Sequence, residues 1–115
     1  MGLTIIRDGE HDWCEAPDTW PGKAGGGEPA LSYKALLPRG PGRPNMQRTR
    51  YEPYHFEPPH SHPEDEILYL LGGELQLGDQ TLFPGDALFI EKDTRYSLRA
   101  SASGAEFLRV GFGEN

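Results

Sequence analysis

Three residues near the middle of the chain have the types and spacing of a metal site: His60, His62 and Glu66. Side chains alternate between the two faces of a strand, so both imidazoles are expected to project to the same side. Pro63 then starts a short polar turn, after which Glu66 opens an apolar run and can fold back towards the imidazoles. Two neutral imidazoles and one carboxylate form the facial ligand set of non-heme iron(II) sites, which leaves positions open for a substrate or oxygen.

The ligand types leave the identity of the metal open. Two imidazoles and a carboxylate suit iron, manganese, nickel, copper or zinc, and the order of affinities alone does not select one of them in a cell. Such an ion acts as a Lewis acid or activates a bound water, and a redox-active ion can also bind dioxygen. The alternative is that the histidine pair is a solvated strand end, and we expect the neighbouring Glu64 and Asp65 to be solvated turn residues.

The segments that must position this cluster are short and β-like. Glycine and proline interrupt the chain at close intervals, and no segment has the periodicity of a helix. This pattern predicts an antiparallel β-sandwich or barrel. We expect strands at residues 2–7, 31–37, 45–52, 66–71, 74–77, 80–83, 87–91, 96–99 and 106–112.

The strand expected at residues 45–52 has one charged face and one uncharged face. Alternation alone does not decide which face lines a cavity, although a charged pair is more often solvated or paired with acidic residues. The charged face carries Arg48 and Arg50, and the other carries Gln47, Thr49 and Tyr51.

A third histidine, His55, is a further candidate for the lining of the cavity. It precedes His60 by five residues, which would place it on the opposite face of an uninterrupted strand. Pro58 and Pro59 interrupt the strand, so alternation does not fix the side on which His55 lies.

Length and composition predict one small acidic domain. The chain has 115 residues, of which 36% are hydrophobic and 25% charged, which is enough for a single modest core. Its net charge of −7 argues against nucleic acid and anionic membrane surfaces as partners, because both bind clustered lysine and arginine. A small molecule is the expected partner.

The N-terminal part, residues 1–44, is expected to be an edge strand and an acidic loop rich in glycine and proline, packed on a barrel formed by residues 45–115. Trp13 and Trp20 are expected to anchor this loop on the barrel wall. Cys14 has no second cysteine to pair with, as is usual in a reducing compartment. No signal peptide or membrane-spanning run is visible, so we expect a cytoplasmic protein.

The histidine cluster resembles the first motif of the cupin superfamily, G-x5-H-x-H-x3,4-E-x6-G. The match runs from His60 through His62 and Glu66 to Gly73 with the family spacing, although Tyr54 replaces the first glycine. The resemblance, to a small single-domain cupin of the conserved-barrel type, implies a double-stranded β-helix or jelly-roll barrel that encloses a divalent metal ion.

The second cupin motif is matched less well. Gly78, Pro84 and Gly85 follow its pattern without the usual spacer, and Tyr96 stands where the family has a further metal-binding histidine. A neutral phenol is a poor metal ligand, although a nearby dication favours the phenolate. Tyr96 could therefore bind the metal, mark the loss of the metal site, or donate a hydrogen bond to a metal-bound water or a substrate. The last role is favoured because it requires no pKa shift.

Two functions follow from these patterns. The first is a metal-dependent enzyme, most simply a dioxygenase, with isomerases and lyases also implied by the resemblance. The second is a non-catalytic cupin that binds a small molecule or a metal, which the missing histidine favours. We also expect a homodimer, in which Leu3, Ile5 and Ile6 add an edge strand to a second copy of the chain.

Overall fold

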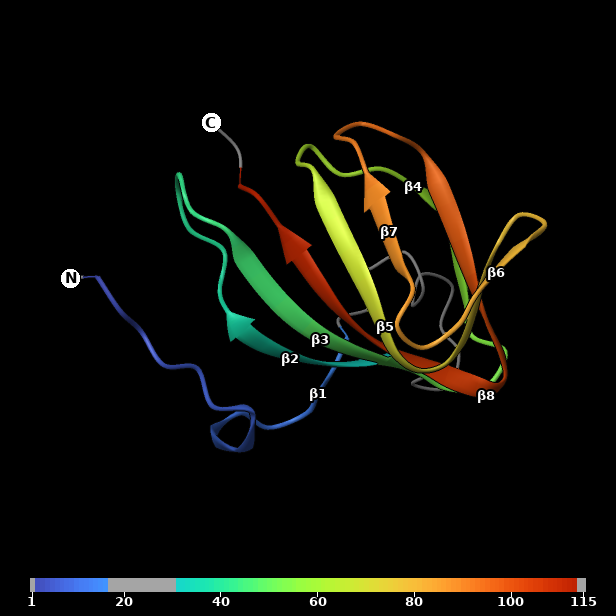
Figure 1. Cartoon of the computed structure of the whole chain (residues 1–115), viewed down its shortest axis with the longest axis horizontal. Helices are drawn as coiled ribbons and strands as arrows, with labels where there is room; N and C mark the ends of the chain where they lie inside the picture. The colour runs from blue at the N-terminus through green and yellow to red at the C-terminus, as the bar shows by residue number, and fades with distance from the viewer. Residues whose placement is uncertain (1, 17–30, 114–115) are drawn as a thin grey trace.

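The computed structural model describes residues 2–16 and 31–113. Within these ranges the chain is almost entirely β, with one short 3-10 helix near the N-terminus (Figure 1). The elements are η1 (Asp8–Glu10), β1 (Cys14–Glu15), β2 (Leu31–Leu37), β3 (Asn45–Tyr51), β4 (Phe56–His60), β5 (Glu66–Leu77), β6 (Gln80–Leu82), β7 (Ala87–Ile90) and β8 (Tyr96–Gly111).

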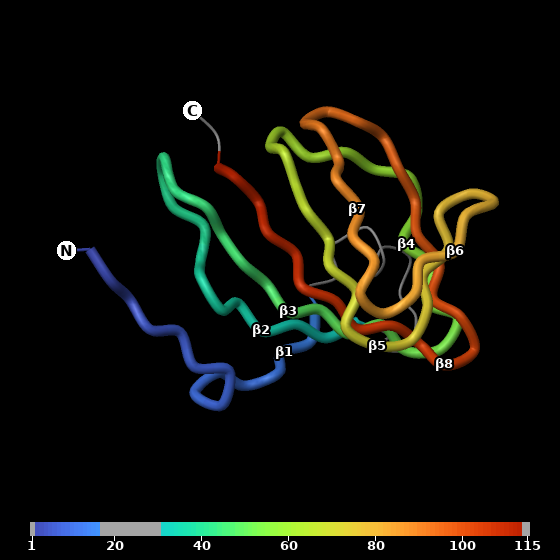
Figure 2. The backbone as a smooth tube through the Cα atoms, viewed as in Figure 1, coloured from blue at the N-terminus to red at the C-terminus, as the bar shows by residue number. Residues whose placement is uncertain are grey.

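Every strand pairing is antiparallel, as the sequence predicts. The strands follow the order β1-β2-β3-β8-β5-β6, and β4 pairs with β8 while β7 pairs with β5. The two longest strands, β5 and β8, curve round one end of the barrel and so belong to both of its halves (Figure 2). The prediction of an all-β antiparallel barrel is therefore confirmed.

The curvature of β5 and β8 depends on two facing glycines. Gly73 in β5 has a φ of +71°, and a Cβ built on it would lie 2.0 Å from the carbonyl oxygen of Gly104 in β8. Gly104 has a φ of +75° itself. Only glycine combines this backbone conformation with so close an approach, and the register between β5 and β8 shifts on either side of Gly73.

The interior of the barrel is filled by aliphatic and aromatic side chains on alternate positions of these strands. Leu68 and Leu70 of β5 are 3% and 2% exposed, and Leu98 and Phe107 of β8 are 2% and 3% exposed. Burial of such side chains stabilises the fold by about 1.5–3 kcal/mol each. This core closes one side of the cavity described below.

The expected strands differ from the observed ones in several places, and β4 is not among the expected strands. Residues 2–7 form no strand, and the first strand is Cys14–Glu15. Gly72 and Gly73, expected to reverse the chain, lie inside β5, because the facing glycines let the strand bend instead of ending. Residues 101–104, expected to be a turn, are part of β8 for the same reason.

The N-terminal segment is held on the outer face of β2 and β3 by charge. Asp8 accepts hydrogen bonds from Lys34 and Arg48 at 3.0 Å each. The Trp13 ring lies 4.1 Å from the guanidinium of Arg50, so this tryptophan does pack on the barrel wall. Trp20 lies outside the described residues. No helix in the described ranges is long and apolar enough to cross a membrane.

Candidate metal and ligand site

Strand β4 carries His60 into the interior through a local irregularity. His60 pairs with Tyr96 of β8, and Glu57 pairs with Leu98 of the same strand. Tyr96 and Leu98 are two residues apart, whereas Glu57 and His60 are three apart, so β4 contains one extra residue at Pro58 and Pro59. This bulge places both Glu57 and His60 on the inner face of the strand, which regular alternation would not do.

The structure brings His60, His62 and Tyr96 together. The two imidazole rings meet edge to face with their centroids 4.9 Å apart, and the Tyr96 ring lies 4.6 Å from that of His60 and 6.4 Å from that of His62. His60 Nδ1 lies 2.8 Å from the carbonyl oxygen of Pro58. A carbonyl can only accept, so in neutral His60 the proton is on Nδ1 and the lone pair of Nε2 is free.

Glu66, the third predicted ligand, is fully buried at the start of β5. One of its oxygens, Oε1, accepts a hydrogen bond of 3.2 Å from the Tyr96 hydroxyl, and the other, Oε2, accepts one from Nε of Arg109. Within residues 2–16 and 31–113, no three histidine, cysteine, aspartate or glutamate side chains lie close enough to form a complete metal site. Glu66 is thus turned to Tyr96 and Arg109 and not to the histidine pair.

Burial controls the protonation of His62 and Tyr96. It lowers the pKa of His62, an effect that Glu66 opposes and Arg109 reinforces, so the imidazole is neutral near pH 7. Burial also raises the pKa of Tyr96 far above that of a free phenol, and the negative charge of Glu66 raises it further. Tyr96 is therefore a neutral hydrogen-bond donor, and its acceptor in this structure is Glu66; donation to a metal-bound water or a substrate stays a prediction.

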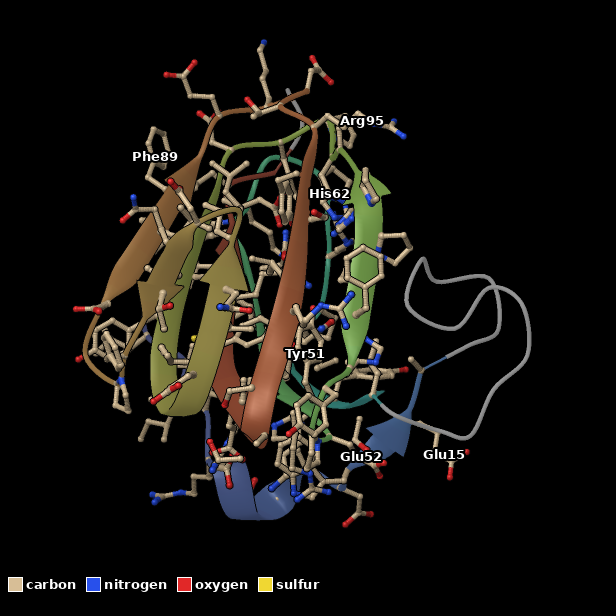
Figure 3. All side chains as sticks on the ribbon, turned by 90° about the vertical axis from the view of Figure 1, so that its right-hand side faces the viewer. Glu15, Tyr51, Glu52, His62, Phe89 and Arg95 are labelled. Atoms are coloured by element: carbon tan, nitrogen blue, oxygen red, sulfur yellow. The ribbon has the colours of Figure 1, made fainter. Side chains whose placement is uncertain are left out.

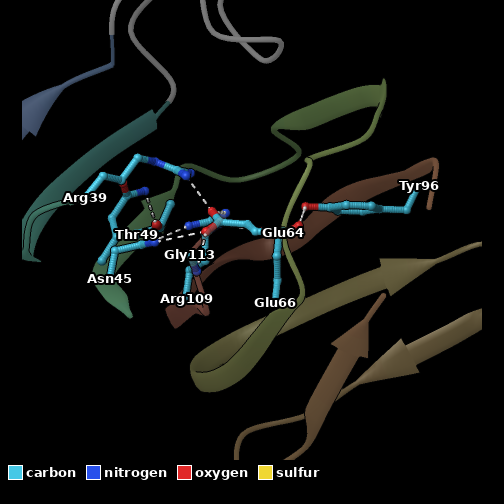
Figure 4. A network of polar contacts seen from close by, with 9 residues as sticks. Arg39, Asn45, Thr49, Glu64, Glu66, Tyr96, Arg109 and Gly113 are labelled. Atoms are coloured by element: carbon cyan, nitrogen blue, oxygen red, sulfur yellow. Dashed lines mark hydrogen bonds and ion pairs between the residues drawn. The ribbon is translucent and has the colours of Figure 1, made fainter. Parts of the chain in front are cut away.

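Glu64 is the centre of a second polar cluster and corrects a prediction. It was expected to be a solvated turn residue but is only 2% exposed. Its carboxylate accepts hydrogen bonds from Arg39, Arg109, the Asn45 side chain and the Gly113 backbone (Figure 4). Burial alone would raise its pKa, but the bonds from Arg109 and Asn45 outweigh burial and lower it to about 2.

Arg109 joins the two clusters. Its Nε bonds to Glu66 and its two terminal nitrogens bond to Asn45 and Glu64, at 2.9 and 2.7 Å respectively. Desolvation lowers the pKa of this guanidinium, but Glu66 and Glu64 outweigh it and the net shift is upward. The guanidinium therefore fixes both carboxylates from one side.

A cavity of about 200 Å³ lies between the rings of His60, His62 and Tyr96 and the apolar core. This volume suits a ligand smaller than the drug-sized ones that fill pockets of roughly 300–1,000 Å³. The wall has both apolar and polar members, and the apolar ones are Leu31, Leu68, Leu98 and Phe107. Figure 3 shows His62 and Tyr51 at different heights along the barrel. The polar members are Arg39, Gln47, Thr49, Tyr51, Glu57, His60, His62, Tyr96 and Arg109.

Strand β3 presents its uncharged face to this cavity. Arg48 is on the opposite face, where it pairs with Asp8 and with Glu106 at 2.8 Å. His55 is 6% exposed and sits behind Glu57, with its Nε2 3.3 Å from a Glu57 carboxylate oxygen. Neither Arg48 nor His55 is among the residues that form the cavity wall.

Sequence reasoning missed four charged residues of this site: Arg39, Glu57, Glu64 and Arg109. Glu57 is hidden by the two prolines that change the alternation, and Arg109 stands in an otherwise ordinary strand sequence, F-L-R-V-G. A signal for Arg109 was nevertheless present, because a charged residue at an inward position between apolar neighbours requires a buried partner of opposite charge.

Comparisons with known proteins identify the fold. No family model matches the sequence, and no curated protein is matched by its sequence. Among solved structures, KdgF from Halomonas sp. is 19% identical with a TM-score of 0.77, and the match covers 98% of this chain and 96% of that one. An RmlC-like cupin protein from Ralstonia eutropha is 12% identical with a TM-score of 0.78, covering 98% and 70%.

A third similar structure is an oxalate decarboxylase from Bacillus subtilis, described with Mn(II) centres. It is 21% identical with a TM-score of 0.63, and the match covers 73% of this chain and 26% of that one. These likenesses show that the chain has the cupin fold, as the resemblance of its first motif implied. They also make a divalent metal a group to test against the residues present.

The side chains that could act as metal ligands fit a divalent ion in part. His60 offers a free Nε2, with Nδ1 held by a carbonyl as metal-binding histidines commonly are. His62 is neutral and adjacent, which is the form that binds a metal. Within residues 2–16 and 31–113, Oε1 of Glu66 has a hydrogen bond from the Tyr96 hydroxyl alone, so a change of partner would free it for a cation.

Proposed function

We propose that the chain is a metal-dependent cupin enzyme that acts on a small organic molecule, with the ion held by His60, His62 and Glu66. The observation that carries the proposal is the pair of imidazoles at the cavity, of which His60 has its Nε2 free. When bound, the ion would supply Lewis acidity, or oxygen chemistry if it is redox-active. Dioxygenase, isomerase and lyase reactions all belong to this proposal.

The residues around the imidazoles support chemistry beyond simple binding. Tyr96 is a neutral donor next to His60, so it could transfer its one hydrogen bond from Glu66 Oε1 to a substrate oxygen without a change of protonation state. Arg109 holds Oε2 of Glu66 and so limits which carboxylate oxygen can turn towards the cavity. The cavity has polar groups on its wall, whereas a sealed apolar chamber would favour a binding role only.

A specific observation favours a second function, a metal-free cupin that binds a small molecule. Glu66 makes hydrogen bonds with both carboxylate oxygens, one to Tyr96 and one to Arg109. In this alternative the guanidinium and the phenol replace the metal as partners of the carboxylate, and His60 and His62 contact the ligand directly.

Metal analysis separates the two functions. Protein purified without chelator is analysed for metals, and chelated protein is titrated with Mn(II), for wild type, the His60→Ala, His62→Ala double variant and a Glu91→Gln control at an exposed position. The metal-dependent function predicts about one ion per chain in wild type and control and none in the double variant. Absence of metal from wild type, or equal metal in the double variant, overturns it in favour of the metal-free function.

We also propose that two chains associate through the N-terminal segment. Leu3 and Ile5 are 97% and 76% exposed, which is unusual for aliphatic residues with nothing to cover them. Light scattering coupled to size exclusion is expected to give a dimer for wild type and a monomer for a chain that lacks residues 1–7. That deletion keeps Asp8 and its bonds to the barrel. A monomeric wild type contradicts the proposal, and so does a deletion variant that remains dimeric.

A further inference from the structure

Glu57 is a buried carboxylate that the proposed metal site does not use. It is 6% exposed, lies on the inner face of β4, and forms part of the cavity wall together with His60. The residue opposite it on β8 is Leu98, and Leu68 and Phe107 line the same cavity, so an apolar side chain would suit this position better for packing alone.

Two residues behind Glu57 hold it in place. His55 Nε2 lies 3.3 Å from Glu57 Oε2, and the Tyr51 ring packs on the His55 ring at 4.5 Å between centroids. Tyr51 also packs edge to face on Phe107 at 5.1 Å, which anchors the group in the core. Tyr51 and His55 therefore act as positioning residues, and the Glu57 carboxylate, which pairs with His55, is the charged member of the group on the cavity wall.

The arginine and lysine side chains nearest the cavity pair with carboxylates other than Glu57. Arg39 bonds to Glu64, and Arg109 bonds to Glu64 and Glu66, so these two guanidiniums are matched by two carboxylates. Lys34 and Arg48 are on the outer face of the sheet with Asp8. Among the described residues, the ion-pair partner of Glu57 is His55, which is charged only when it is protonated.

We propose that Glu57 is a ligand-binding residue, which accepts a hydrogen bond from a hydroxyl or ammonium group of the small molecule held in the cavity. The ligand class is a compact organic molecule with a carboxylate or carbonyl oxygen at one end, which would bind the ion held by the His60 and His62 pair, and a donor group at the other. Only the part of this inference that concerns the His60 and His62 end of the ligand rests on the proposed function. The β4 bulge serves it, because the extra residue turns both Glu57 and His60 towards the same molecule.

A set of matched probes tests the inference. Benzoates that carry a hydroxyl, aminomethyl, methoxy or methyl group at the 3-position present the same carboxylate and differ only at the far end. Binding is measured by calorimetry and by NMR shifts in the full chain, with metal and after chelation. We expect the hydroxyl and aminomethyl probes to bind about tenfold or more tightly than the methoxy and methyl probes, because only the first two donate to a carboxylate.

Three variants sharpen the test. Glu57→Gln keeps the shape but removes the charge, and is expected to weaken the aminomethyl probe most, by about tenfold or more, while the methyl probe is unaffected. Glu52→Gln, at an exposed position of the same segment, is the matched control and is expected to bind like wild type. His55→Phe keeps an aromatic ring beside Tyr51 and is expected to reduce the preference for donor probes without affecting metal content. Thermal unfolding shows that each variant is folded.

The outcomes decide between the two proposals independently. Equal affinity for all four probes, no binding by any donor probe, or an unchanged preference in Glu57→Gln overturns the role of Glu57. If the preference and its loss in Glu57→Gln appear in protein that binds no metal, the role of Glu57 stands and the metal-dependent function falls. If wild type binds metal but shows no preference among the probes, the metal-dependent function stands and the role of Glu57 falls.

Discussion

Two buried glutamates of this barrel, Glu64 and Glu57, show how differently a fold can treat the same side chain. Glu64 accepts bonds from two arginines, an asparagine and a backbone amide, so its charge is fully matched. Glu57 has a hydrogen bond to His55 and a polar contact with the Tyr51 hydroxyl, no arginine or lysine partner among the described residues, and it faces a cavity. The comparison indicates that a saturated carboxylate stabilises the structure, whereas one with spare capacity beside a cavity is available to a ligand.

The largest expected effect breaks the saturated side of this comparison. Glu64→Ala leaves the Arg109 guanidinium, whose side chain is 10% exposed, with one carboxylate partner fewer, and removes the acceptor of the Asn45 side-chain amide N–H. Breaking a buried ion pair in this way costs about 3–5 kcal/mol. The free energy of unfolding in urea measures the loss, with Glu91→Gln expected to match wild type. A loss below about 1 kcal/mol would contradict the structural role of Glu64.

Acid should weaken the same cluster. The pKa of Glu64 is about 2 in the fold against 4.5 ordinarily, so its contribution is complete above pH 4.5 and disappears as the pH falls towards 2. The shift corresponds to about 3 kcal/mol. The stability difference between wild type and Glu64→Gln should therefore shrink between pH 6 and pH 3. A difference that stays constant over this range would show that the charge of Glu64 is not what stabilises the fold.

The next effect concerns the bend of β5 and β8 at Gly73 and Gly104. Gly73→Ala places a methyl group 2.0 Å from the Gly104 carbonyl at a φ of +71°. We expect a loss of about 2 kcal/mol or more in stability. Gly72→Ala is the matched control, because a Cβ there meets nothing within 4 Å. Equal stability of the two variants would contradict the close approach of the strands.

The fold was predictable from the sequence because its signals are local. Short apolar runs between glycine and proline turns predict an antiparallel barrel, and the spacing from His60 to Gly73 fits the cupin fold that the comparisons show. The strand at 31–37 was predicted to the residue. Strands β5 and β8 were each divided in two, because a glycine pair that bends a strand has the same sequence signal as one that reverses the chain.

The site was predictable only where its members stand at the spacing of a known motif. Tyr96 was found from motif spacing, and the structure places its ring beside His60. Arg109 is 43 residues from its partner Glu66, and only the pairing of β8 with β5 brings them together. Glu57 could not be assigned to a face because the bulge at Pro58 and Pro59 changes the alternation. Long-range pairing and one extra residue are therefore what local reasoning lacks.

The smallest expected effect concerns the cavity wall, where His62 lies, as opposed to the Glu64 cluster. His62→Ala removes a partly buried imidazole whose pKa burial already lowers, so the variant loses little that the fold depends on. We expect its free energy of unfolding, measured after chelation, to fall by less than about 1 kcal/mol, against the several lost in Glu64→Ala. Without chelation, a bound ion would add its own stabilisation to wild type and enlarge the difference. A loss in chelated His62→Ala as large as that in Glu64→Ala would mean that the histidine pair is as structural as the carboxylate cluster, and the division between a closed and an open region would fail.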